Sequence, residues 1–241
     1  MNVQNNRGLF TKAITYSFPV LLGYLAIGIA FGLLMTDAGY PWWLSLIMSV
    51  VMYAGAGQYI AVGLFAAGAG FLEAALVQLV VNTRHMAYGL TMLKRFNASG
   101  PYKYYLIFAL TDETFALLSS LPEGENRENQ SRFMFLAALL NQGYWIAGTV
   151  AGALLGTFIP FNMKGIDFAL TALFVVLMIE QILRVKRPPP FIISALAAIL
   201  GAVFLPSRLS LLSAMVIALT AVQLLTGKEH RNTGNLEAGN G

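Results

Sequence analysis

Long apolar runs, each close to the length that a helix needs to cross a bilayer, constrain this chain more than any other feature. A helix of roughly 20 apolar residues spans the hydrocarbon layer of a membrane. Only 11% of the residues are charged, whereas roughly a quarter are charged in a soluble domain. The sequence therefore predicts an all-α fold, a polytopic membrane helix bundle of about eight hydrophobic elements. These runs cover residues 14–35, 42–67, 71–93, 102–121, 132–158, 165–183, 189–205 and 208–226.

A single transmembrane domain is predicted over residues 14–226, with a polar segment on either side. Residues 1–13 show no small-residue cleavage site after a short apolar core, so the first run is predicted to be a retained helix. Residues 227–241 are rich in Gly and Asn and are predicted to form a disordered tail. Lys and Arg are more frequent in the loops on the side of the N-terminus, which predicts cytoplasmic termini and no nucleic-acid partner.

Two of the runs contain residues that break helices. Residues 53–59 read Tyr-Ala-Gly-Ala-Gly-Gln-Tyr, and residues 141–145 read Asn-Gln-Gly-Tyr-Trp. Glycine weakens a helix by about 1 kcal/mol relative to alanine, and within lipid the freed backbone groups must be satisfied by protein or water. Runs 42–67 and 132–158 are therefore predicted to be broken, with the breaks facing the protein interior. Whether they span fully or re-enter is left open, because the Lys and Arg count favours cytoplasmic termini either way.

A faint internal repeat accompanies these breaks. Residues 72–81 resemble residues 166–176, and residues 31–34 resemble residues 115–118. Such matches predict two three-helix units related by inversion, plus two extra helices, which is a common plan among transporters. Chance similarity between short apolar stretches is the alternative.

Polar and charged side chains gather in the third run. Gln78, Asn82 and His85 follow helical spacing and form one stripe, whereas Arg84 lies about 100° away in line with Tyr88. A charge near the bilayer centre costs at least about 2.5 kcal/mol by insertion scales, so Arg84 needs a partner or water.

Two adjacent acids in the next run, Asp112 and Glu113, are the natural partners of Arg84. They point about 100° apart on a helix and cannot both face the same group. We expect Asp112 to form the ion pair, and Glu113, left without a counter-charge, to exchange a proton. His85 titrates near neutral pH and is a second candidate for proton coupling. The alternatives are an ion pair that only fixes helix register and a histidine that only hydrogen-bonds a backbone carbonyl.

Motifs of several enzyme classes are absent from the sequence. The chain has no cysteine, which excludes disulfides and thiolate sites. It has no Gly-x-x-x-x-Gly-Lys-Ser/Thr loop, no His-Glu-x-x-His and no Gly-x-Ser-x-Gly. No enzymatic activity, cofactor or metal site is therefore predicted.

Three motifs occur in a fixed order: Ala-Gly-x-x-Gln within residues 52–64, Asn-x-Arg-His within 80–92 and Thr-Asp-Glu within 110–118. Together with residues 18–32 they resemble the AzlC family, the large subunit of bacterial branched-chain amino acid exporters. The family often has serine or alanine where this chain has Ala56 and Gly57. Beyond about residue 165 little of the chain matches.

The resemblance implies export of valine, leucine, isoleucine and related amino acids across the bacterial cytoplasmic membrane, driven by protons. It also implies a small hydrophobic AzlD-like partner subunit in the same lipid bilayer. Two alternatives are a pore for ions or small neutral solutes and a non-transporting scaffold subunit. A pore needs a continuous polar file, whereas the polar residues here cluster at mid-depth.

The substrate is expected between the broken runs and the third and fourth runs. Its carboxylate is expected at backbone N–H groups near Gly57 and Gln58, because a helix N-terminus carries partial positive charge, with Arg84 as the rival anchor. Asp112 or Glu113 is expected to meet the ammonium group. The predicted substrate-binding residues are Gly57, Gln58, Arg84, Asp112, Phe115, Asn141 and Gln142, the proton-coupling residues are His85 and Glu113, and the structural polar stripe is Gln78, Asn82 and Tyr88.

Overall fold

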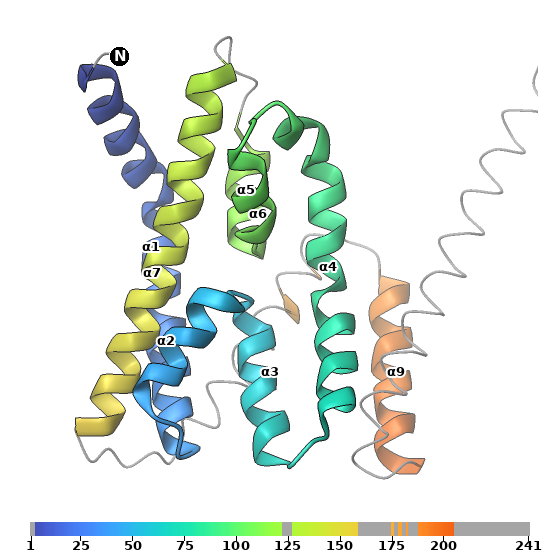
Figure 1. The fold of residues 1–241 in the computed structure, drawn as a ribbon. Helices are drawn as coiled ribbons and strands as arrows, with labels where there is room; N and C mark the ends of the chain where they lie inside the picture. Colours follow the sequence, from blue (N-terminus) through green and yellow to red (C-terminus); the bar gives the residue numbers. More distant parts are fainter. Residues whose placement is uncertain are drawn as a thin grey trace, which may run out of the picture. The chain divides into compact units, whose positions relative to one another are not determined.

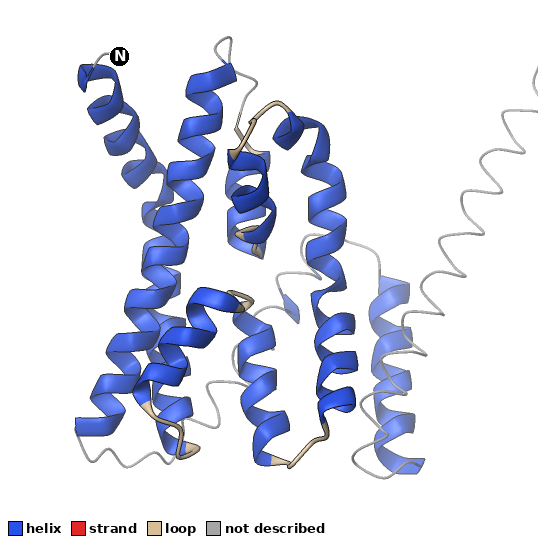
Figure 2. Cartoon of the chain, viewed as in Figure 1, coloured by secondary structure: helices blue, strands red, loops and turns tan. Residues whose placement is uncertain are grey.

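The computed structural model describes residues 3–121, 127–158, 175, 178, 179, 182 and 188–204. These residues form helices joined by short loops (Figure 2), which confirms the predicted all-α fold. The chain divides into two units, Met1–Leu173 and Phe174–Gly241. In the second unit, helix α9 (Pro188–Phe204) begins with three prolines, which fit the first turn of a helix. The predicted run 208–226 and the tail 227–241 lie outside the described residues.

Two long helices form the scaffold of the first unit. Helix α1 (Val3–Asp37) starts well before the predicted apolar run, and helix α7 (Arg127–Phe158) lies beside it along most of its length (Figure 1). At 1.5 Å per residue they are about 52 and 48 Å long. Both are long and apolar enough to cross a membrane.

The crossing of α1 and α7 depends on facing glycines. Gly28 and Gly32 on α1 lie against Gly148 and Gly152 on α7, and each pair is spaced by four residues. A Cβ atom on Gly32 would overlap the backbone at Thr149. Small residues at this spacing let two membrane helices approach until their backbones touch.

The second predicted run is a re-entrant hairpin. Helix α2 (Trp42–Val51) rises to mid-depth and helix α3 (Gly55–Ala66) returns to the same end (Figure 1). Each arm is about 15–18 Å long, roughly half the thickness of the hydrocarbon layer. Tyr53 and Gly55 adopt positive φ at the tip. The predicted break is confirmed here.

The fourth predicted run is also broken, contrary to the prediction of one continuous helix. After α4 (Phe71–Asn97) crosses the unit, α5 (Tyr102–Phe108) descends to mid-depth and α6 (Asp112–Ser119) returns. Thr111 caps α6, its hydroxyl accepting a hydrogen bond from the Thr114 amide. The Thr111 cap and two acids in the first turn favour starting a new helix at this point.

The fifth predicted run is not broken, so that prediction is wrong. Helix α7 continues through Asn141, Gln142 and Gly143 without interruption. One glycine lowers the stability of a helix by about 1 kcal/mol relative to alanine. This loss is small compared with the stabilisation from packing a 32-residue helix against α1. The side chains of Asn141 and Gln142 form hydrogen bonds with the two hairpins.

The repeat that the structure contains differs from the predicted one. The hairpin α2–α3 followed by α4 corresponds to the hairpin α5–α6 followed by α7. These two sets of three helices run in opposite directions within the first unit (Figure 1). The predicted match of residues 31–34 with 115–118 is wrong, because the first lies in long α1 and the second in half-length α6. Residues 166–176 lie outside the described residues, except position 175.

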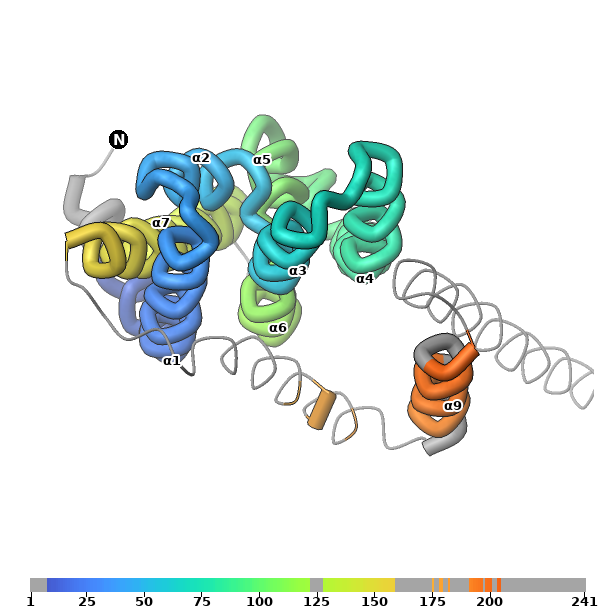
Figure 3. Tube along the Cα trace, turned by 90° about the horizontal axis from the view of Figure 1, so that it is seen from below, coloured from blue at the N-terminus to red at the C-terminus, as the bar shows by residue number. Residues whose placement is uncertain are grey.

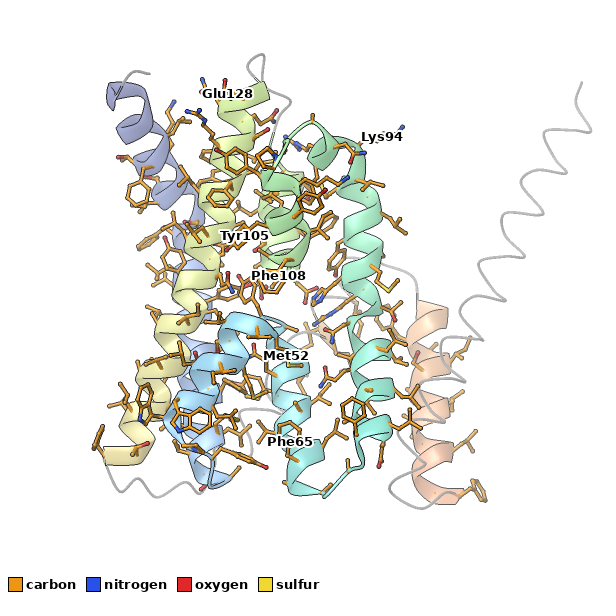
Figure 4. The ribbon with its side chains drawn as sticks, viewed as in Figure 1. Met52, Phe65, Lys94, Tyr105, Phe108 and Glu128 are labelled. Carbon is orange, nitrogen blue, oxygen red and sulfur yellow. The ribbon has the colours of Figure 1, made fainter. Side chains whose placement is uncertain are left out.

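The hairpins lie between the α1–α7 pair and α4 (Figure 3), and their tips face each other near the middle of the unit (Figure 1). Figure 4 shows Phe108 at the end of α5 above Met52 at the end of α2, both near the middle of the unit. The rings of Tyr53 and Phe108 have centroids 6.4 Å apart. Trp145 on α7 contacts Tyr24 edge-on, at 5.4 Å.

We predict that Gly32→Ala will prevent stable folding, because the added methyl group overlaps the α7 backbone. Gly23→Ala is the matched control on the same helix, since nothing lies within 4 Å of its Cβ position. The yield of monodisperse protein in detergent and its thermal unfolding midpoint are the measurements. Equal stability of the two variants would contradict the close crossing.

Candidate functional site

An ion pair joins the middle of α4 to the start of α6. The Arg84 Nη1 atom lies 2.6 Å from Asp112 Oδ2, and the side chains are 28% and 24% exposed. This confirms the predicted contact. Two further atoms of the pair, Arg84 Nε and Asp112 Oδ1, are buried and make no hydrogen bond to the described residues. The pair therefore keeps one donor and one acceptor for another group.

One helical turn further on, Tyr88 on α4 stacks on Phe115 of α6. Their ring centroids are 4.4 Å apart and the planes differ by 9°. The His85 ring lies 6.1 Å from that of Tyr88. Among the described residues, His85 makes this ring contact and no side-chain hydrogen bond to a backbone carbonyl, so the alternative of a histidine that only makes such a bond finds no support. The ion pair and the ring stack thus place an apolar surface next to the charges.

The polar stripe of α4 packs against the first turn of α3. Gln78 Nε2 donates to the Gly57 carbonyl at 2.8 Å. Asn82 Nδ2 donates to the Gln78 carbonyl and side chain at 2.9 and 3.1 Å, whereas Asn82 Oδ1 is buried without a described partner. A Cβ on Gly57 would lie 2.8 Å from Gln78 Oε1. Glycine at this position therefore permits the close approach of α3 and α4.

Helix α3 presents an uncapped N-terminus at the same depth. Its N-cap, Ala54, has no side chain that can accept a hydrogen bond, and its first turn has no acid. The partial positive charge of a helix N-terminus is therefore uncompensated by this helix itself. The Gln58 side chain is fully buried and already engaged, since its Oε1 accepts from Trp145 Nε1 at 2.8 Å.

Asn141 and Gln142 on α7 bind the two hairpins. Gln142 Nε2 donates to the Val50 carbonyl of α2 at 3.1 Å, and its Oε1 accepts from the Tyr105 hydroxyl of α5 at 2.7 Å. Asn141 Nδ2 donates to Thr114 Oγ1 on α6 at 3.1 Å. These amides, predicted to line a helix break, hold the hairpins to an unbroken helix, and their predicted contact with substrate stays a prediction.

The adjacent acids face different helices, as their angular separation predicts. Asp112 faces α4, whereas Glu113 Oε2 accepts a hydrogen bond of 2.8 Å from the Tyr24 hydroxyl of α1. Tyr24 also lies 2.6 Å from Thr111 Oγ1.

A scan against protein-family models matches residues 19–159, more than half of the chain, to the family described as AzlC protein. The chain belongs to the AzlC family. The matched range contains every predicted site residue and ends beside the last residue of α7. No solved structure matches the chain.

Relatives of this AzlC-family chain occur in several bacteria. An uncharacterized membrane protein of Helicobacter pylori (strain ATCC 700392 / 26695) is 37% identical over 89% of this chain and 96% of its own length. The branched-chain amino acid transport protein AzlC of Bacillus subtilis (strain 168) is 36% identical over 74% of this chain and 70% of its own. The inner membrane protein YgaZ of Escherichia coli (strain K12) is 30% identical over 73% and 74%. The chain is therefore similar to membrane transport proteins.

Sequence reasoning missed Tyr24 in this AzlC-family site. A single tyrosine in an apolar helix is usually a core residue or an interfacial anchor. The sequence therefore offers no local signal for the contact of Tyr24 with Glu113. The α5–α6 break, in contrast, had a signal in Thr-Asp-Glu at positions 111–113, since a threonine followed by acids is typical of a helix start.

We predict that Gln142→Leu lowers the free energy of unfolding by roughly 1–3 kcal/mol, because it leaves the Val50 carbonyl and Tyr105 hydroxyl unpaired. Tyr105→Phe removes only one of these bonds and should cost less. Thermal unfolding midpoints of the two variants and the double variant are the measurement. Unchanged stability with a weakened apparent affinity for leucine would instead support Gln142 as a substrate ligand.

Proposed function

We propose that this chain is the large subunit of a secondary transporter that exports valine, leucine, isoleucine and analogues across the cell membrane, coupled to proton entry. The observation that carries the proposal is the mid-depth meeting of two half-helix N-termini with the Arg84–Asp112 pair. Discontinuous helices with ends at the membrane midplane are a common way to bind charged substrates. The Bacillus subtilis relative is named a branched-chain amino acid transport protein, which supports branched-chain amino acids as the substrate class.

The arrangement suits both charged ends of an amino acid. The carboxylate is proposed to bind at the uncapped start of α3 near Gly57 and Gln58, with Arg84 Nε as a further donor. The ammonium group is proposed to bind Asp112 Oδ1, a buried acceptor. The branched side chain then lies against the stacked rings of Tyr88 and Phe115.

The charge distribution supports a cytoplasmic N-terminus. Apart from Arg84, the described lysine and arginine side chains belong to the start of α1, the end of α4, and the starts of α5 and α7, which lie at one end of the unit. Cytoplasmic ends of membrane helices carry an excess of Lys and Arg. The α5–α6 hairpin therefore enters from the cytoplasm in this proposal, and the α2–α3 hairpin from outside. The side chains concerned are Lys12, Lys94, Arg95, Lys103 and Arg132.

Flux of labelled leucine in proteoliposomes tests the proposal. A transporter shows saturable exchange of labelled for unlabelled leucine, a pore conducts without saturation, and a scaffold does neither. The chain is assayed alone and with a small hydrophobic AzlD-like subunit, which we expect to be required. Full exchange by the single chain would refute the partner requirement, and absence of exchange in both preparations would refute the transport proposal.

We predict that Arg84→Ala abolishes leucine export and that Arg84→Lys keeps little of it. A guanidinium can bind Asp112 through Nη1 while Nε remains available, which a lysine ammonium cannot reproduce in the same plane. Arg132→Ala is the control, because Arg132 pairs with Glu128 outside the site. Export by Arg84→Ala at the parental rate would remove Arg84 from the centre of the mechanism.

We predict that substitution of Asp112 mainly impairs folding, whereas substitution of Glu113 mainly impairs proton-driven export. Asp112→Asn leaves Arg84 uncompensated and damages folding, by less than the roughly 3–5 kcal/mol typical of a fully buried pair, since both side chains are partly exposed. Glu113→Gln keeps an acceptor for Tyr24 and should fold and exchange leucine, yet fail to drive uphill export with a proton gradient. Melting midpoints, exchange and uphill flux are measured for both variants. Intact uphill export in Glu113→Gln would leave His85 as the proton-coupling candidate.

A further inference from the structure

Glu113 lies in a cluster of oxygen atoms that the proposed substrate contacts do not use. Tyr24 from α1 donates to its Oε2 at 2.8 Å, and Thr111 Oγ1 lies 2.6 Å from the tyrosine hydroxyl. Thr114 Oγ1 lies 3.0 Å from that of Thr111, and Asn141 of α7 binds Thr114 at 3.1 Å. We call these five residues the Glu113 cluster.

Part of the acceptor capacity of the Glu113 cluster is unused. Asn141 is fully buried, and its Oδ1 makes no hydrogen bond to the described residues, although its Nδ2 is bound within the cluster. Nearly every buried polar atom in a protein has a partner, so such an oxygen is an exception that calls for a ligand. A carbonyl oxygen accepts but cannot donate, so the missing partner is a donor or a cation.

The charge of the cluster points in the same direction. No lysine, arginine or histidine nitrogen among the described residues lies within 4.0 Å of the Glu113 carboxylate, whereas Arg84 is matched by Asp112. An ionised carboxylate inside a membrane requires a compensating positive charge. One carboxylate and several neutral oxygens suit one monovalent cation. The described residues contain no group of three or more acids, histidines or cysteines that could hold a divalent metal.

We propose that the Glu113 cluster binds a sodium ion. The ligands are the Glu113 carboxylate, Asn141 Oδ1 and the hydroxyls of Tyr24 and Thr111, whose protons can rotate so that a lone pair faces the ion. The Tyr24 hydroxyl lies 2.8 Å from Glu113 Oε2 and 2.6 Å from Thr111 Oγ1, so a small cation among these three oxygens needs less expansion of the cluster than potassium does. Hard cations prefer oxygen ligands of this kind. The half-helix C-terminus of α5, which ends at this break, adds negative partial charge.

The sodium site deepens the proposed function and rests on it for its role in transport. The same carboxylate accepts either sodium or the coupling proton, so the two ions exclude each other at Glu113. The other titratable or charged groups that face this region are Tyr24 of α1, Tyr53 at the α2–α3 tip, and Arg84 with Asp112. Sodium binding itself can be measured without any amino acid.

Thermal unfolding of the detergent-purified full chain tests sodium binding directly. Sodium chloride replaces choline chloride at constant ionic strength, with potassium chloride as a second series. A ligand that binds the native state raises the unfolding midpoint in a saturable way. We expect a saturable upward shift with sodium, little shift with potassium, no sodium-dependent shift in Glu113→Gln, and a several-fold higher half-saturating sodium concentration in Tyr24→Phe.

Glu73→Gln is the matched control, because Glu73 lies in the first turn of α4, a helix that contributes no residue to the cluster. It should respond to sodium like the parent chain. Equal shifts with sodium and choline, or a full sodium response in Glu113→Gln, would overturn the proposal. If Glu113→Gln does not fold, Tyr24→Phe becomes the deciding variant. A half-saturating sodium concentration in Tyr24→Phe equal to that of the parent chain would reject the sodium site.

Leucine flux separates this proposal from the proposed function. Sodium-dependent stabilisation without leucine exchange would uphold the ion site and refute the transport proposal. Leucine exchange without any sodium response would refute the ion site and leave proton coupling in place. In a preparation that shows both, an inward sodium gradient at equal pH should accelerate leucine export, and Glu113→Gln should remove that acceleration.

Discussion

Within residues 3–158, as far as the structure describes them, two hairpins of half-length helices end at mid-depth, and in a bilayer each freed backbone group has to be satisfied by protein or water. Helix α7 meets part of this requirement and holds the half-helices in place. Gln142 donates to the Val50 carbonyl near the end of α2, whereas Asn141 and Trp145 bind the side chains of Thr114 on α6 and Gln58 on α3. These contacts need α7 to be continuous and fixed in position. The glycine-lined crossing with α1 supplies that fixation, because the two backbones touch there.

The centre of the unit is electrically asymmetric. Helix α6 begins with two acids, so its positive end is more than compensated, whereas α3 begins with small residues and no acid. The Arg84–Asp112 pair is neutral as a whole and joins α4 to the start of α6. The side of α6 therefore favours cations and the side of α3 favours anions. A zwitterion has both charges, which is why this geometry supports an amino acid rather than a simple ion as the substrate.

The sequence predicted some of this from residues whose chemistry allows few solutions. An arginine inside an apolar run needs an acid, and the next run held only two, so the Arg84–Asp112 contact could be predicted. The α2–α3 break followed from clustered glycines. The same reasoning failed at Gly143, because a single glycine cannot outweigh the packing of α7 on α1. It also passed over the α5–α6 break, which contains no glycine and where the Thr111 cap starts a new helix. Tyr24 could not be predicted, since its contact depends on tertiary packing alone.

The opposed hairpins suggest how one binding site serves two sides of a membrane. The two hairpins lie in opposite halves of the unit (Figure 1), so in the proposed transporter each would separate the site from one aqueous phase. Gln142 contacts both hairpins through a single amide, donating to α2 and accepting from α5. If one hairpin moves away from α7, the Gln142 amide loses one of its two hydrogen bonds and keeps the bond to the other hairpin. Because an unpaired buried group is costly, simultaneous release of both hairpins is disfavoured, which is the condition that alternating access requires.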